Sequence, residues 1–557
     1  MSTPEKYLAN QQTHEVFNQA LPLVDYNLFT SDKTLVQALS REGAAWAEEH
    51  LKNFGEIMGR AETIALGVQA NDNQPVLRTH DRYGYRVDEV DFHPAWHALM
   101  KISVENGLHS LPWREPKTGA HVARAALVSL IGQIEAGHLC PISMTYSVVP
   151  ALRKEPNVAA NWESKITSNS YDPRFRPVKE KTGAIMGMAM TEKQGGSDVR
   201  ANTTRATAIG NSGEYLIVGH KWFCSAPMSD AFLVLAQTPS GLTCFLLPRW
   251  TEDGKRNNFH LQRLKSKLGN KSNASSEVEF RDAWAVRVGA EGKGVQTIIE
   301  MVTHTRLDCV IASAGLMRQA FVQAVHHANY RSAFGKKLID QPLMRNVLAD
   351  LAVESQAATI LMMRLARSFD QRSDKDFESP FQRIATAISK YWTCKRTVSH
   401  VYESLECLGG NGYVEESIMP RLYREAPLYS IWEGSGNVIC LDVLRAAAKE
   451  PNTMQAFMKE IALAKGGNSY LDAYARSLEK DLFELAKNPI NLETQARRLV
   501  ERLALALQGS LMVRFGHKAT ADAFCISRLA GDWGNCFGTL PGNVDLTAIL
   551  ENAQPSY

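Results

Sequence analysis

A glutamate with aromatic and glycine neighbours is the residue best suited to acid–base chemistry in this chain. Glu433 lies between Trp432 and Gly434 in the segment LYSIWEGSGN, directly before a predicted helix. A carboxylate beside a large aromatic ring loses hydration, which raises its pKa toward the range of a general base. The same position also suits an ordinary acidic residue that the dipole of the following helix stabilises.

Two segments upstream could hold a flat ring system. The turn GMAMTEKQGGSDV, residues 187–199, combines Thr, paired glycines, Ser and Asp, which can present N–H and hydroxyl groups to an anion or a ring edge. In KWFCS, residues 221–225, a ring could pack on Phe223 while the Ser225 hydroxyl reaches a ring nitrogen. Taken alone, each segment is better explained as an ordinary capped glycine turn or a core strand.

Two further segments could bind phosphate. YRSAFGKKLIDQP, residues 330–342, offers Arg331 to a pyrophosphate and Gln341 to an adenine or ribose. LGGNGY, residues 408–413, is a turn rich in N–H groups. A helix C-terminus favours Arg and Gly for local reasons as well, so capping remains an alternative for both segments.

The elements that position these segments change along the chain. Residues 1–185 show apolar residues at three- and four-residue steps and predict an α-helical domain, which ends in a Pro-bearing stretch at 168–183. Residues 186–290 contain short apolar runs with close turns and predict a small antiparallel barrel or sandwich. Residues 291–445 predict a helix bundle, and 446–557 a helical extension with a Gly-rich tail of uncertain order after about Gly531. The predicted fold class is α+β.

Composition restricts the class of protein further. The formal net charge of the 557 residues is +3, which gives no whole-molecule field that favours nucleic acid. Nine cysteines occur without a CxxC pair or zinc-ligand spacing, so we expect a reduced cytoplasmic chain without a metal site. The polar N-terminus lacks the features of a secretory signal, and no apolar stretch approaches the ~20 residues of a transmembrane helix.

Together and in this order, these segments resemble the acyl-CoA dehydrogenase superfamily over residues 187–445. MTEKQGGSDV, GHKWF, KLGNKSNASSEVEF, QPLMR, LYRE and SIWEGSGN are similar to its AidB-like branch, which is linked to the bacterial response to DNA alkylation. The resemblance implies an N-terminal α-helical domain, a middle β-domain, a C-terminal helix bundle and a helical extension. It also implies FAD as the cofactor.

The resemblance implies a role for individual positions. Glu433 corresponds to the base that removes an α-proton from an acyl-CoA while hydride passes to flavin N5, and Arg306 to a nearby pocket arginine. Both steps need the substrate between base and flavin, so these groups must come from different domains. The motif with Arg331 and Phe334 reaches the FAD of a neighbouring subunit in the family. The implied FAD-binding residues are Met190, Thr191, Gly196, Ser197, Phe223, Cys224, Ser225, Arg331, Phe334, Gln341, Gly409, Gly410, Ile431, Trp432, Gly434, Ser435 and Asn437.

The chain departs from the family pattern at two places. Lys-Gln-Gly-Gly follows the Thr-Glu of the flavin loop where the family usually has Pro-x-Ala-Gly, and Phe223 stands in place of the usual Trp. We expect FAD binding to survive both changes. No segment identifies a CoA groove or the length of an acyl pocket.

The AidB-like branch is associated with binding of double-stranded DNA through its C-terminal helical part. Residues 446–557 contain twelve Lys or Arg and twelve Asp or Glu, so their net charge is zero. Phosphate binding would therefore require cations gathered on one face, and a solvated helix with ordinary ion pairs is the alternative. The candidate positions are Arg445, Arg497, Arg498, Arg502, Arg514 and Lys518.

The resemblance further implies a homotetramer, because the family builds tetramers from dimers that share FAD sites. Three functions follow from it. The first is an AidB-like flavoprotein that binds DNA and retains a dehydrogenase site. The second is a metabolic short- or branched-chain acyl-CoA dehydrogenase that passes electrons to an electron-transfer flavoprotein. The third is a DNA-shielding assembly whose flavin is structural.

Overall fold

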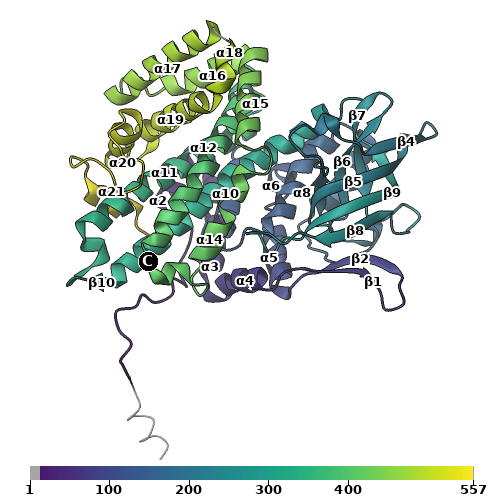
Figure 1. The fold of residues 1–557 in the computed structure, drawn as a ribbon, viewed down its shortest axis with the longest axis horizontal. Coiled ribbons are helices and arrows are strands. Elements are labelled where there is room, and N and C mark those ends of the chain that lie inside the picture. Colours follow the sequence, from purple (N-terminus) through teal and green to yellow (C-terminus); the bar gives the residue numbers. More distant parts are fainter. Residues whose placement is uncertain (1–12, 488, 556–557) are drawn as a thin grey trace, which may run out of the picture.

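A computed structural model of the chain describes residues 13–487 and 489–555, and it places a β-domain beside a larger helical body (Figure 1). Helices precede and follow the β-domain in the sequence and pack together in one core. The predicted α+β class, with an N-terminal helical, a middle β and a C-terminal helical domain, is confirmed. No helix of the described ranges is both long and apolar enough for a membrane span.

The N-terminal region is mainly helical, and its helix α7 is buried along its whole length. Its helices are α2 Lys33–Arg41, α3 Glu48–Gly59, α4 Ala61–Asp72, α5 Pro94–Glu105, α6 Leu111–Arg114, α7 Ala120–Gly132, α8 Leu139–Leu152 and α9 Pro156–Ile166. The sequence did not predict the antiparallel hairpin of β1 Val76–His80 and β2 Arg86–Asp91. This hairpin lies below the β-domain (Figure 1), and its partly exposed, charged strands lack the apolar alternation that marks a buried strand.

The β-domain is a closed ring of strands with two strands added at its sides. Strand β6 pairs with β4 and β7, β4 with β5, β5 with β9, and β9 with β7, while β3 joins β6 and β8 joins β9. The predicted barrel is therefore present, but β3 and β4 run parallel to β6, which the antiparallel prediction missed. The strands are β3 Met186–Ala189, β4 Arg205–Ile209, β5 Glu214–Ser225, β6 Ala231–Thr238, β7 Gly241–Pro248, β8 Phe259–Leu264 and β9 Ser275–Arg287.

Three long helices form the centre of the helical body. They are α10 Gly294–Tyr330, α11 Pro342–Asp370 and α12 Glu378–Glu406, and each is buried over most of its length. Shorter elements follow or connect them: β10 Ser332–Ala333, β11 Lys336–Lys337, α13 Gly410–Tyr413, α14 Met419–Glu425 and α15 Gly436–Lys449. The catalytic candidate Glu433 lies in the turn between α14 and α15.

The C-terminal extension is joined to this centre by a buried ion network. Arg364 of α11 is fully buried and pairs with Glu378 of α12 at 3.1 Å and Glu460 of α16 at 2.8 Å. The Gly-rich tail, expected to be of uncertain order, contains a helix instead: Asp545 caps α21, and Arg318 donates to the Ala553 carbonyl at 2.8 Å. The extension comprises α16 Pro451–Ala462, α17 Ser469–Lys487, α18 Pro489–Thr494, α19 Ala496–Phe515, α20 Lys518–Phe524, a π-helical turn at Cys525–Leu529 and α21 Leu546–Ala553.

Candidate functional site

The backbone of Glu433 has a left-handed conformation, with φ of +57°. Such a conformation costs a non-glycine residue about 1–3 kcal/mol and persists only where neighbouring contacts enforce it. Lys390 of α12 supplies two of these contacts, since its buried ammonium donates to the carbonyls of Trp432 at 2.7 Å and Gly434 at 2.6 Å. The turn is thereby fixed on both sides of the glutamate.

Arg306 of α10 holds the same turn from the other side. Its Nε donates to the Glu433 carbonyl at 3.0 Å, and its Nη1 donates to the carboxylate of Asp442 at 2.7 Å. Arg383 also pairs with Asp442, at 3.0 Å. The Arg306 side chain thus orients the backbone of the glutamate, a positioning role that the sequence did not indicate.

The Glu433 carboxylate accepts a hydrogen bond of 2.7 Å from the Thr305 hydroxyl. Burial raises the pKa of Glu433 above its ordinary value, while this hydrogen bond and the positive charges of Arg306 and Lys390 oppose the rise. A carboxylate with a raised pKa holds an abstracted proton more strongly than a fully hydrated one. The environment therefore suits a general base.

Cys140, in the second position of α8, connects the glutamate to the β-domain. Burial raises the pKa of its thiol to about 11; hydrogen bonds with Asn273 and Ser225 lower it, and the negative charge of Glu433 raises it. Ser225 in turn lies 3.2 Å from the Ser275 hydroxyl, to which Lys267 donates at 2.9 Å. The Cys140 thiol therefore lies close to the end of β5, and the charge of the candidate base influences it.

The predicted ring-binding loop is anchored by a buried ion pair. Glu192 and Lys221 are fully buried and 2.8 Å apart. Burial alone raises the pKa of the Glu192 carboxyl, but the Lys221 ammonium and hydrogen bonds from Thr203 and Thr204 lower it below its ordinary value. Within the loop, a Cβ on Gly196 would meet the Thr191 hydroxyl at 2.4 Å, so this close approach requires glycine.

A bulge in β5 exposes the predicted ring-packing residue. The register of β5 against β9 shifts between Lys221 and Cys224, and Phe223 is 49% exposed while Cys224 is fully buried. Trp222 donates its backbone N–H to the Thr191 carbonyl at 2.8 Å. The bulge therefore lies beside the loop, with an apolar ring turned outward.

The structure places five predicted FAD-binding residues elsewhere. Arg331, Phe334 and Gln341 follow the C-terminal end of α10, and the helix rises about 36 Å between Arg306 and that end. Gly409 and Gly410 follow the end of α12, about 24 Å along that helix from Lys390. These five residues therefore cannot join the Glu433 turn within one chain.

Residues near the N-terminus bring these two distant segments together. Asn18 accepts from the Arg331 guanidinium at 2.7 Å through its backbone carbonyl, and the neighbouring Gln19 accepts from Asn411 at 3.1 Å. Phe334 is fully exposed on the β10–β11 hairpin, and its φ is +52°. An apolar ring held out in this way is typical of a contact with another chain.

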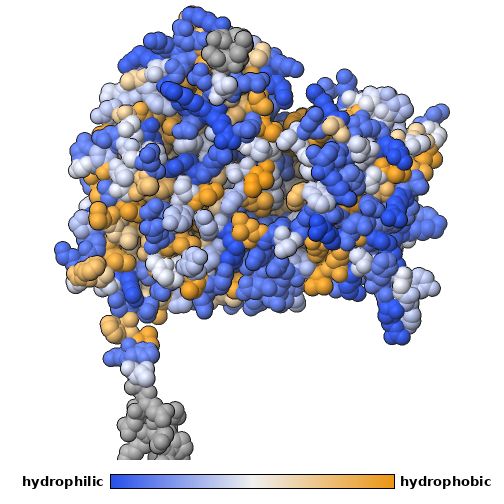
Figure 2. Space-filling model, in the orientation of Figure 1, coloured by the Kyte–Doolittle hydropathy of each residue, from blue (hydrophilic) through white to orange (hydrophobic). Residues whose placement is uncertain are grey.

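The residues near Glu433 fit the flavin that the sequence predicts. A Cβ on Gly195 would meet nothing within 4 Å, so this backbone is open to a ligand, and the buried Trp432 Nε1–H has no acceptor among residues 13–487 and 489–555. Ile431 is 62% exposed beside it, and Ser435 and Ser197 are also exposed. Figure 2 shows the surface of the molecule hollowed between the C-terminal helices and the β-domain. Among the described residues, no cluster of His, Cys, Asp and Glu could hold a metal ion.

Ion pairs engage several of the candidate DNA-binding residues. Arg502 is paired with Asp481, Arg514 pairs with the buried Glu460 at 2.8 Å, and Lys518 pairs with Asp522 at 2.9 Å. Arg497 and Arg498 are exposed in the first turn of α19, and Arg497 donates to Asn437 of α15 at 2.7 Å. Arg445 is 62% exposed on α15. Lys518 is 87% exposed despite its pair, so the accessible cations among these candidates are Arg445, Arg497, Arg498 and Lys518.

Comparisons with family models divide the chain into three matched segments. Residues 18–173 match the adaptive response protein AidB N-terminal domain, 187–283 the acyl-CoA dehydrogenase middle domain, and 292–448 the acyl-CoA dehydrogenase C-terminal domain. The matched ranges end before α16, so the extension lies outside them.

Relatives of similar length cover the extension as well. The chain is 46% identical to the putative acyl-CoA dehydrogenase AidB of Escherichia coli, over 92% of this chain and 94% of that protein. It is 31% identical to acyl-CoA dehydrogenase family member 11 of Caenorhabditis elegans, over 89% of this chain and 81% of that protein. The crystal structure of C. elegans ACDH-11 in complex with C11-CoA superposes with a TM-score of 0.86 at 27% identity, covering 94% of each chain.

Proposed function

Because this chain belongs to the acyl-CoA dehydrogenase family, in the branch with an AidB-type N-terminal domain, we propose that it is an FAD flavoprotein with a dehydrogenase site in which Glu433 is the base. The observation that carries this proposal is the left-handed Glu433 turn, held by Lys390 and Arg306 with the carboxylate on Thr305. A purely structural turn would not require a half-buried carboxylate with a raised pKa.

Two groups of residues contribute to the reaction: one holds the cofactor, and the other carries and positions the base. Bound FAD supplies the hydride acceptor. Phe223 and the 190–197 loop hold and orient its ring, and Ser225 offers a hydroxyl to the ring edge. One carboxylate oxygen of Glu433 accepts the α-proton of the acyl thioester. Thr305 holds the other oxygen in place through its hydrogen bond. Lys390 and Arg306 keep the turn in place, which limits the motion of the base.

We propose an assembly in which each chain completes the FAD site of its neighbour. The distance of Arg331, Phe334, Gln341, Gly409 and Gly410 from the Glu433 turn, and their convergence around Asn18 and Gln19, support this arrangement. A dimer is the smallest such assembly, and a homotetramer is the form that the family resemblance favours.

The visible spectrum of the purified protein tests the cofactor directly. Flavin absorption bands and release of FAD on denaturation are the expected results. Protein that is colourless and takes up no added FAD would contradict the proposal. Bleaching of the flavin by isovaleryl-CoA under anaerobic conditions would then demonstrate the reductive half-reaction, whereas FAD that no acyl-CoA reduces would favour a structural flavin.

Thr305→Val is expected to shift the acid limb of flavin reduction to higher pH by about 0.5–1 unit. The hydrogen bond from Thr305 stabilises the charged form of Glu433 and lowers its pKa, so its loss raises that pKa further. Glu433 acts as a base only in its charged form. The rate of flavin reduction therefore rises as the pH passes through the pKa of Glu433. The measurement is the single-turnover rate of flavin reduction from pH 5 to 9, with Thr303→Val on the exposed face of α10 as control. An unchanged profile would separate Thr305 from the base.

We further propose that the protein binds double-stranded DNA through Arg445, Arg497 and Arg498. Their exposure supports this choice, since the Arg502 and Arg514 side chains are only 16% and 17% exposed. The contact of Arg497 with Asn437 also brings the start of α19 against α15, the helix of Arg445. The relation to AidB of E. coli supports it only by analogy.

Charge reversal tests the DNA surface. Arg445→Glu with Arg498→Glu is expected to weaken DNA retention and to reduce the slope of log affinity against log salt by about two. The matched control is Arg476→Glu with Lys480→Glu, two exposed residues of α17, which makes the same charge change elsewhere in the extension. FAD content should stay the same in both. Equal loss in test and control would assign the effect to net charge alone, and no loss in the test variant would remove this surface from the proposal.

The alternative function is a metabolic short- or branched-chain acyl-CoA dehydrogenase without a DNA role. Rapid bleaching by a thioester together with no salt-dependent DNA retention would favour this alternative. An electron-transfer flavoprotein is then the expected electron acceptor.

A further inference from the structure

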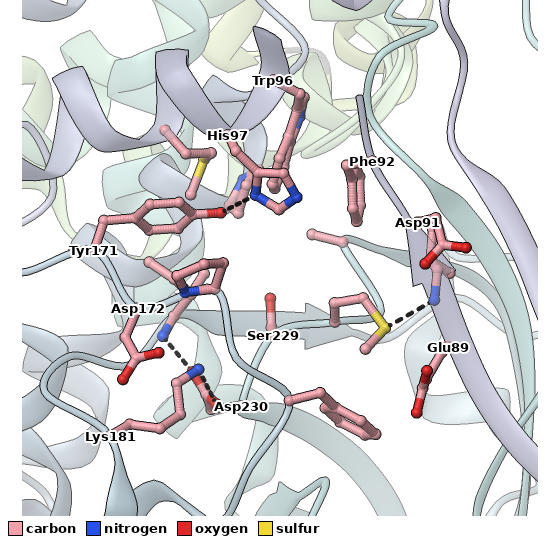
Figure 3. A pocket seen from close by; sticks show the side chains of 18 residues that line it. Glu89, Asp91, Phe92, Trp96, His97, Tyr171, Asp172, Lys181, Ser229 and Asp230 are labelled. Atoms are coloured by element: carbon pink, nitrogen blue, oxygen red, sulfur yellow. Dashed lines mark hydrogen bonds and ion pairs between the residues drawn. The ribbon is translucent and has the colours of Figure 1, made fainter. Parts of the chain in front are cut away.

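A cavity lies between the N-terminal helices and the β-domain (Figure 3). Its volume is about 260 Å³, and β2, α5, the loop after α9 and the residues between β5 and β6 contribute its walls. Glu433, Thr305 and Arg306 do not line it. It adjoins the FAD region only through Pro141 and Ala226, the sequence neighbours of Cys140 and Ser225.

Aromatic rings and methionines form much of the apolar part of the cavity wall. Phe92 stacks on Trp96 with ring centroids 3.9 Å apart, and Tyr171 faces them across the space (Figure 3). Met100 and Met228 complete this apolar lining. Aromatic rings and thioethers form favourable contacts with a flat apolar ligand.

The charged groups that line the cavity already have partners. Asp230 pairs with Lys181 at 2.7 Å, Asp172 with Arg174 at 2.6 Å, and Glu89 with Arg256 at 2.6 Å. Asp91 pairs with Arg78 at 2.7 Å. With these pairs formed, the cavity offers no unpaired charge, and a neutral ligand is the one it suits.

Two polar groups of the lining lack partners. The Trp96 Nε1–H and the Ser229 hydroxyl are buried without a hydrogen bond, and their residues are 6% and 3% exposed. A buried donor without an acceptor costs about 1–3 kcal/mol, and a ligand acceptor would recover that cost. The indole can only donate, so the ligand must carry an acceptor.

We propose that this cavity binds a neutral, single-ring aromatic molecule with a carbonyl or ring-nitrogen acceptor, which receives hydrogen bonds from Trp96 and Ser229. The volume equals that of about nine waters in the liquid, which suits one substituted ring. The inference requires neither flavin nor turnover, and it is therefore independent of the dehydrogenase proposal.

Titration with a matched pair of probes tests the proposal. Acetophenone carries a ring and a carbonyl, and isopropenylbenzene replaces the carbonyl oxygen with a methylene of nearly the same shape. We expect acetophenone to bind with one-to-one stoichiometry and more tightly than isopropenylbenzene. Trp96→Phe and Ser229→Ala should each weaken acetophenone about threefold to tenfold, and Trp96→Phe should leave isopropenylbenzene unaffected.

Trp162→Phe is the control, because it makes the same chemical change on α9 outside the cavity. Calorimetry measures affinity, and the thermal unfolding midpoint confirms that each variant is folded. If Trp96→Phe proves unstable, the affinity of Ser229→Ala for acetophenone still tests the proposal. Failure of acetophenone to bind, equal affinity for the two probes, or affinities that neither variant alters would each overturn the proposal.

Discussion

Glu433→Gln is expected to retain FAD but to reduce the flavin about 10²- to 10⁴-fold more slowly with any acyl-CoA substrate. The amide keeps the size of the side chain and can still accept the Thr305 hydrogen bond, but it cannot take the α-proton. Anaerobic single-turnover reduction by isovaleryl-CoA, followed in the flavin band, measures this effect apart from binding.

Glu416→Gln provides the matched control for this experiment. Glu416 is exposed in the stretch between α13 and α14, so removal of its charge should change neither FAD content nor rate. A reduction rate in Glu433→Gln equal to that of the parent would show that another group is the base. Loss of FAD from Glu433→Gln would instead indicate that the carboxylate has a structural role in the turn.

Lys221→Met is expected to destabilise the protein by about 3–5 kcal/mol, because it leaves the Glu192 carboxylate buried without its counter-ion. The Leu235 carbonyl also loses the donor that contacts it at 2.9 Å. The Glu192 carboxylate accepts hydrogen bonds from the backbone N–H groups of Thr203 and Thr204. Without its counter-ion this carboxylate should hold the 190–197 loop less firmly, which should reduce the affinity for FAD. The measurements are the urea midpoint and the FAD content.

The double variant Glu192→Gln with Lys221→Met separates charge from packing. It removes both charges, so most of the lost stability should return. Lys255→Met breaks the exposed pair with Asp253 and should change stability by less than about 1 kcal/mol. A double variant no more stable than Lys221→Met would show that the loss comes from packing rather than from the unpaired carboxylate.

The sequence predicted the candidate base and the family, because Glu433 and its neighbours form one continuous segment. The groups that hold Glu433 could not be predicted in the same way. Thr305 lies 128 residues before it in sequence, and Lys390 lies 42 residues before Trp432. Each is one polar residue within a long, mainly buried helix, where no local pattern distinguishes a hydrogen-bonding partner from a solvated side chain.

Other parts of the fold were missed for related physical reasons. The strands of the β1–β2 hairpin are mainly half-buried and rich in charged residues, and they lack the apolar alternation of a buried strand. Helix α21 is eight residues long, and it follows a Gly-rich stretch that resembles an unstructured tail; contacts with distant residues such as Arg318 hold it in place. The cavity of Figure 3 combines residues from four separate segments, which only the folded chain brings together.

The hydrogen bond between Arg497 and Asn437 joins the first turn of α19 to the first turn of α15, the helix that directly follows the Glu433 turn. A polyanion that drew the guanidinium away would also release Asn437. Thermodynamic reciprocity then applies: by whatever factor such a ligand changed the affinity for FAD, FAD would change the affinity for that ligand. A titration of either ligand in the presence of the other would measure this shared free energy from both directions.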